Sequence, residues 1–138
     1  SIMSAKELVK AFYESDLAND STIAPKFFHK DCELHWSSSH GFMLLKYNDI
    51  VDFFEGTRKS YHSLRFEFTH LIEADASVIT RHTLFGHTIE NPDSEIILAH
   101  FSTIWEVKDD KLYRGYEISQ QADESDIKSM DSYAEIKL

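Results

Sequence analysis

The first sixty residues contain segments in which apolar and polar positions repeat with the period of a helix. Ser4 and Glu7 have the spacing of a capping box. An apolar stripe at roughly helical spacing follows: Leu8, Val9, Phe12 and Leu17. Residues 19–21 break this helix, and a second, short helix is expected to run through Phe27 and Phe28. We expect a strand at residues 32–37 and a third helix that begins with Asn48 as its N-cap.

From residue 64 onward the period changes to two, which is typical of strands. One face of the first long strand is expected to carry Leu64, Phe66, Phe68, His70 and Ile72. Turns are expected at residues 74–76, 91–93 and 108–111, and the last strand at residues 112–120. Helices followed by a meander of long strands predict an α+β domain over residues 1–121. Residues 122–138 are acidic and Ser-rich, and we expect them to be a loosely packed tail.

Composition narrows the class of protein further. The 138 residues suit one domain with a real core, since 42% are hydrophobic and 13% aromatic. The formal net charge of -10 would repel nucleic acid and anionic membranes, so neither is expected as a partner. The single cysteine, Cys32, rules out an internal disulfide, and no apolar run is long enough to cross a bilayer. We therefore expect a cytoplasmic protein.

Three stretches carry a resemblance to a known group of proteins. They are residues 12–20 leading into FFHKD at 27–31, VITRHTLFG at 78–86 and IWEVKDDKL at 104–112. They resemble the nuclear-transport-factor-2-like superfamily, in its SnoaL-like branch, which includes polyketide cyclases, ketosteroid isomerases, limonene epoxide hydrolases and scytalone dehydratases. The resemblance implies a cone-shaped, cystatin-like roll, with three N-terminal helices packed on a strongly curved antiparallel sheet. It also implies a deep pocket and a homodimer formed through the outer sheet face.

The resemblance mostly predicts which family mechanisms are absent. The hydrogen-bonding tyrosine of ketosteroid isomerases would fall on Phe12, their catalytic aspartate on Trp36 and their second acid on Thr103. A tryptophan cannot act as the base and a phenyl ring cannot donate to an enolate, which excludes the isomerase mechanism. In the epoxide hydrolase pattern, the aspartate of the last strand would fall on Glu117, which keeps a carboxylate. The arginine of the central strand would fall on His82. The dehydratases have histidines around their pocket, and the pair His70 and His82 resembles that arrangement loosely.

His82 and Glu117 are the candidate catalytic residues. His82 is expected to face inward, where it is either a core histidine or a ligand-contacting one. For Glu117 the two arguments disagree: strand alternation turns it outward, and the family comparison turns it into the pocket. The expected ligand contacts are Phe12, Trp36, Phe54, His70, Thr103, Trp105 and Ser119. The histidines lack metal-ligand spacing, so neither a metal nor another cofactor is expected.

The function expected from the sequence is a pocket for a small, largely apolar organic molecule. If the protein is catalytic, His82 assisted by Glu117 would transfer protons in a lyase, isomerase or hydrolase step without a cofactor. The alternative is a non-catalytic dimeric ligand-binding or protein-interaction module whose cavity is closed. In that module the outer sheet face, with His100, Ser102 and Ile104, would hold the partner.

Overall fold

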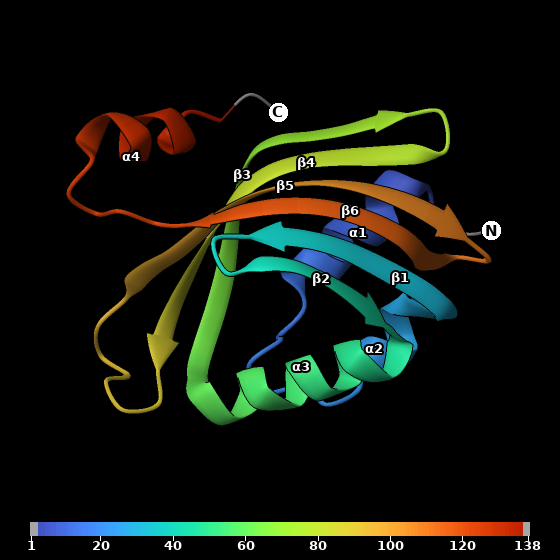
Figure 1. The fold of residues 1–138 in the computed structure, drawn as a ribbon, viewed down its shortest axis with the longest axis horizontal. Coiled ribbons are helices and arrows are strands. Elements are labelled where there is room, and N and C mark those ends of the chain that lie inside the picture. Colours follow the sequence, from blue (N-terminus) through green and yellow to red (C-terminus); the bar gives the residue numbers. More distant parts are fainter. Residues whose placement is uncertain (1–2, 137–138) are drawn as a thin grey trace.

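A strongly curved six-stranded sheet forms most of the computed structural model, which describes residues 3–136 (Figure 1). The elements in chain order are α1 (Ala5–Glu14), α2 (Ile23–Phe27), β1 (Phe28–Ser38), β2 (Gly41–Lys46), α3 (Tyr47–Ser60), β3 (Tyr61–Ala74), β4 (Ser77–Thr88), β5 (Ile96–Lys108), β6 (Lys111–Gln121) and α4 (Ile127–Ala134). The sheet order is β2-β1-β6-β5-β4-β3. Within the described residues, no helix is long and apolar enough to cross a membrane.

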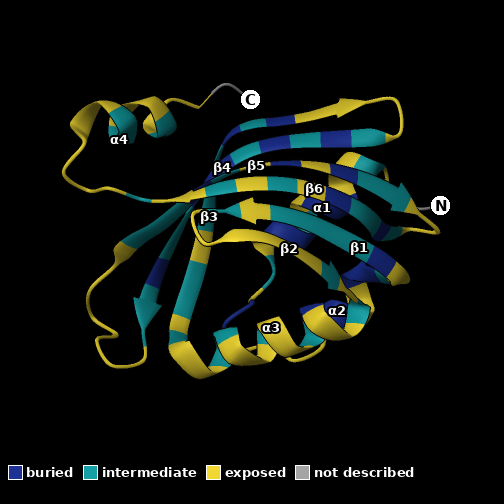
Figure 2. Ribbon diagram, viewed as in Figure 1, coloured by how far each residue is buried: buried dark blue, intermediate teal, exposed yellow. Residues whose placement is uncertain are grey.

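Helix α1 brings the aromatic core to the inner face of the sheet. Its capping box is confirmed, because Ser4 Oγ accepts from the Glu7 N–H at 3.1 Å and the Glu7 carboxylate accepts from the Ser4 N–H at 3.0 Å. The apolar stripe of α1 is buried against residues of β3, β4 and β5 such as Leu71, Val78 and Trp105. Figure 2 shows these buried positions on α1 and on the central strands.

The first half of the chain differs from its predicted elements in three respects. Strand β2 was not expected. It is an edge strand that follows a turn at Gly41, whose φ of 105° suits glycine. Helix α3 begins at Tyr47, so the Asn48 N-cap is wrong; instead Asp49 Oδ2 accepts from the Lys46 N–H at 2.9 Å. Strand β1 pairs with β6 in parallel, so the sheet is antiparallel except at the pair β1-β6.

The turns in the second half are confirmed. Strands β3 and β4 meet at Asp75, with φ of 53°, and β5 and β6 meet at Asp109 and Asp110, with φ of 53° and 60°. Aspartate tolerates this left-handed region better than most residues. Two consecutive positive φ values twist a two-residue turn in the sense that a hairpin needs.

Two β-bulges change which side chains face inward. At Thr69 the pairing moves from Phe68 with His82 to His70 with Arg81, so beyond this point the predicted face of β3 is wrong. Ile72, expected on the apolar face, is 47% exposed, and Leu71 is buried instead. A bulge inserts one residue, and the alternation of faces therefore reverses.

The second bulge lies in β6. Glu106 pairs with Arg114 and Val107 with Leu112, which leaves Tyr113 unpaired between them. Leu112 is fully buried, whereas Tyr116 and Ile118 are exposed on the opposite face. Simple alternation along residues 112–120 would place all three side chains on one face and Glu117 on the other, outward one. The bulge makes this wrong and turns Glu117 inward.

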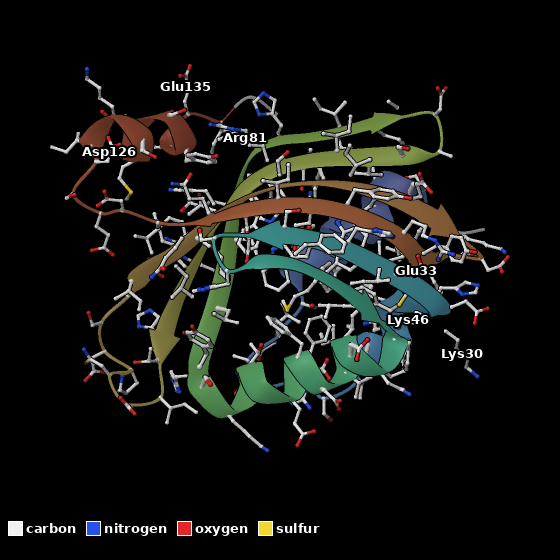
Figure 3. All side chains as sticks on the ribbon, in the orientation of Figure 1. Lys30, Glu33, Lys46, Arg81, Asp126 and Glu135 are labelled. Atoms are coloured by element: carbon white, nitrogen blue, oxygen red, sulfur yellow. The ribbon has the colours of Figure 1, made fainter. Side chains whose placement is uncertain are left out.

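Residues 122–136 include the helix α4, which contacts the outer face of the sheet. The Arg81 guanidinium donates to Ser132 Oγ at 3.0 Å and lies 3.8 Å from the centre of the Tyr133 ring. His100 stacks on the same ring at 3.8 Å. Figure 3 shows Arg81 close to this helix. The division into a domain of residues 1–121 and a loosely packed tail stays a prediction. The contacts of Arg81 and His100 show where α4 touches the sheet.

Candidate functional site

A cavity of about 510 Å3 lies between helices α1 and α3 and the inner face of the sheet. Its wall is mainly apolar and includes ten aromatic residues. The lining residues that are also exposed mark its mouth: Ser39, His40, Met43, Phe53 and Gln121. A chamber of this size and lining is typical of sites for small organic molecules.

The sheet register places Glu117 in this cavity. Across four neighbouring strands Thr80 pairs with Thr103, Thr103 with Glu117, and Glu117 with Trp36. Directly paired residues project from the same face of a sheet. The inward orientation that the family comparison gave for Glu117 agrees with this register, whereas simple alternation along the strand does not.

The Glu117 carboxyl is held in surroundings that oppose its ionisation. Thr103 Oγ1 donates a hydrogen bond to Glu117 Oε1 at 2.7 Å. Burial raises the pKa of Glu117 from 4.5 to about 7, and the Thr103 hydrogen bond offsets only part of that rise. The carboxyl therefore exchanges its proton near neutral pH, as a general acid or base must.

Tyr13 adds a hydroxyl to the same site. Its oxygen accepts a hydrogen bond from Trp105 Nε1 at 2.9 Å. Burial first, and then the charge of Glu117, raise the pKa of Tyr13 well above its usual value of 10. The phenol therefore keeps its proton and can donate it in a hydrogen bond.

Gly115 makes room for this arrangement. A Cβ at this position would lie 2.6 Å from Trp105 Cζ3 and 2.7 Å from Leu34 Cδ1. The bare backbone therefore lets the Trp105 ring lie against β6 and reach Tyr13.

Sequence reasoning missed Tyr13, because counting from residues 19 and 20 placed the equivalent tyrosine on Phe12. Neighbouring residues of a helix differ in direction by about 100°, so a count that ends on Phe12 says nothing of Tyr13. The available signal was the pair Val9 and Tyr13, which are four residues apart and so share a helix face. Both Phe12 and Tyr13 are buried and line the cavity.

His82 lines the cavity but is not joined to Glu117. Its side chain is 1% exposed, and its Nδ1 lies 3.1 Å from Thr80 Oγ1. Its ring is nearly parallel to that of Phe101, with centroids 5.1 Å apart. Burial lowers the pKa of His82 to about 3, so the imidazole stays neutral. Among the described side chains, no hydrogen bond or ion pair links it to Glu117.

The structure brings most of the other predicted contacts together. The cavity lining includes Phe12, Trp36, Phe54, Trp105 and Ser119. Trp36 Nε1 donates to Ser119 Oγ at 2.8 Å, which fixes the indole in the wall.

Two predicted contacts lie elsewhere. Thr103 is fully buried behind Glu117 and does not line the cavity. His70 is turned away from the cavity by the bulge at Thr69, and its Nδ1 lies 2.8 Å from Thr69 Oγ1.

Solved structures share this fold. IdmH from Streptomyces antibioticus, a candidate polyketide cyclase, is 12% identical with a TM-score of 0.67, over 95% of this chain and 99% of its own. A candidate SnoaL-like polyketide cyclase from Jannaschia sp. CCS1 is 10% identical with a TM-score of 0.64, over 96% and 94%. An NTF2-like protein from Burkholderia pseudomallei is 14% identical with a TM-score of 0.60, over 83% and 90%. The predicted α+β roll is confirmed.

At these identities the structural likeness establishes the fold alone. No curated protein sequence matches the chain significantly. Residues 9–115, in contrast, match the family model described as the SnoaL-like domain. Because this match covers well over half of the chain, the protein belongs to the SnoaL-like family.

Proposed function

We propose that the cavity binds a small, largely apolar organic molecule, and that Glu117 transfers a proton to and from it without a cofactor. The observation that carries the proposal is a single carboxyl among the described residues of a mainly apolar chamber, with a pKa raised to about 7. Such a group is half ionised at neutral pH, where it is most effective as a base. Two of the structural relatives are candidate polyketide cyclases, and this likeness favours a carbonyl-bearing substrate for the cavity.

Glu117 would remove a proton from a carbon next to a carbonyl group. The electrons of that C–H bond would move to the carbonyl oxygen and form an enolate. Tyr13, which keeps its own proton, would donate a hydrogen bond to that oxygen. Glu117 would then return the proton to carbon or oxygen. His82 was the expected proton carrier, but its low pKa makes it a neutral part of the wall in this mechanism.

Hydrogen–deuterium exchange of a ketone tests this proposal. We would follow loss of the C1 proton signal of 2-tetralone in D2O by NMR. The Glu117→Gln variant should lower the protein-catalysed rate by about a hundredfold, since it removes the base. The matched control is Glu90→Gln, which changes an exposed glutamate and should leave the rate unchanged. Equal rates for wild type and Glu117→Gln would remove Glu117 from the mechanism.

The second candidate function is a dimeric ligand-binding or protein-interaction module. Apolar side chains exposed on the outer face of the sheet favour it: Phe42, Leu44, Ile104, Tyr116 and Ile118. We propose that this surface forms a homodimer, because exposed apolar patches of this kind mark interfaces. Ile118 is 69% exposed, and its change to Glu should convert a dimer to a monomer in analytical ultracentrifugation. A monomeric wild-type protein would contradict the proposal.

A further inference from the structure

The described lining of the cavity carries a negatively charged group and no lysine or arginine to balance it. Glu117 is the one carboxylate among the described lining residues, and neither lysine nor arginine is among them. His82 adds no positive charge, because burial keeps it neutral. The whole chain carries a net charge of -10, so its long-range field has the same sign. An anionic ligand would meet repulsion and no compensating cation.

Several aromatic residues line the same cavity as Glu117. Trp36 is paired directly with Glu117 across β1 and β6, and Tyr13 lies near enough for the Glu117 charge to raise its pKa. Trp105 is hydrogen-bonded to Tyr13, and Phe101 lies 6.5 Å from Trp36, centroid to centroid. The faces of such rings carry partial negative charge and attract cations, most strongly when water is excluded.

We propose that the cavity selects ligands with a protonated or quaternary amine on an apolar body, and that the ammonium group binds against the Glu117 carboxylate and the neighbouring ring faces. One anion within an aromatic wall is the arrangement that recognises organic ammonium ions. The inference rests on the proposed function only in taking this cavity as the ligand site. It does not depend on proton transfer from carbon.

The proposal implies a pH dependence with a definite sign. A bound cation favours the ionised carboxylate, so ammonium affinity should rise with pH as Glu117 loses its proton around pH 7. The other titratable groups that line the cavity are Tyr13 from α1, His40 in the turn between β1 and β2, Tyr61 at the start of β3 and His82 from β4. His40 lies at the mouth, and Glu117→Gln separates any contribution of His40 from that of Glu117.

Two probes of nearly the same shape test the inference. Benzyltrimethylammonium is a permanent cation, and neopentylbenzene is its uncharged carbon analogue. Binding is followed by tryptophan fluorescence, since Trp36 and Trp105 line the cavity. For wild type we expect the cation to bind about tenfold more tightly at pH 8 than at pH 5.5. Glu117→Gln should weaken the cation about tenfold at pH 8, leave the neutral probe within about twofold, and abolish the pH dependence.

Several results would overturn the inference. One is a cation affinity that does not change with pH or with Glu117→Gln. Another is a pH dependence that persists in Glu117→Gln, which would assign the effect to a group other than Glu117. If the neutral probe binds and the cation does not, the cavity is a ligand site without the proposed selectivity, and the proposed function survives. If both probes behave as expected but 2-tetralone exchange is absent, the selectivity stands and proton transfer from carbon fails.

Discussion

The buried carboxyl of Glu117 should make the protein less stable as the pH rises. The pKa of this group is about 7 in the folded protein, against 4.5 for an ordinary glutamate, so the folded state holds the proton more tightly. Below pH 4.5 the group is protonated in both states and has no effect. Between pH 4.5 and 7 the unfolded chain ionises and the folded protein does not, so stability falls, and above pH 7 the penalty is constant.

The size of this penalty follows from the pKa difference. At about 1.4 kcal/mol for each pH unit, the full cost is at most about 3 kcal/mol. Water that enters through the mouth of the cavity reduces it. We expect the free energy of unfolding of wild type to fall by roughly 2 kcal/mol relative to that of Glu117→Gln between pH 5 and pH 8.

Urea unfolding followed by tryptophan fluorescence at both pH values measures this difference. Comparison with the variant cancels the titration of all other groups. In Glu117→Gln the side-chain amide keeps an oxygen that can accept from Thr103. The variant can therefore keep the hydrogen bond that spans 2.7 Å in the wild type. Glu90→Gln, at an exposed position, should show no pH-dependent difference from wild type. A constant difference between wild type and Glu117→Gln at pH 5 and pH 8 would refute the raised pKa.

Three further perturbations test how the site is built. Gly115→Ala should destabilise the protein by about 1–3 kcal/mol in urea unfolding, because a Cβ would lie 2.6 Å from the Trp105 ring; unchanged stability would contradict this packing. His82→Leu should leave 2-tetralone exchange within about threefold of wild type by NMR, since the neutral ring only forms wall, and a hundredfold loss would restore His82 as the base. Tyr133→Ala should speed amide hydrogen exchange throughout α4, because the ring contacts to Arg81 and His100 are lost; unchanged protection would show that other contacts hold the helix.

Patterns along the chain were enough to predict several caps, turns and strands, and the family. The capping box at Ser4 and Glu7 and the hairpin turns at Asp75, Asp109 and Asp110 depend on a few neighbouring residues, so local rules predict them. The alternation of the second half predicted the long strands. The stretches at 12–31, 78–86 and 104–112 predicted the SnoaL-like family, which the match over residues 9–115 confirms.

Which residues meet in the cavity depends on pairing and packing between segments that are distant in the sequence. Strand β2 is bounded by no strong turn signal except Gly41, and its edge position comes from pairing with β1. The bulges at Thr69 and Tyr113 reverse the alternation of faces, and they depend on the partner strands, so neither could be placed from one strand alone. The bulge at Thr69 turns His70 away from the cavity, and the bulge at Tyr113 turns Glu117 into it. The pKa values of Glu117 and His82 depend in turn on burial by residues distant in sequence, which is why the sequence could propose this pair but could not assign the proton to one of them.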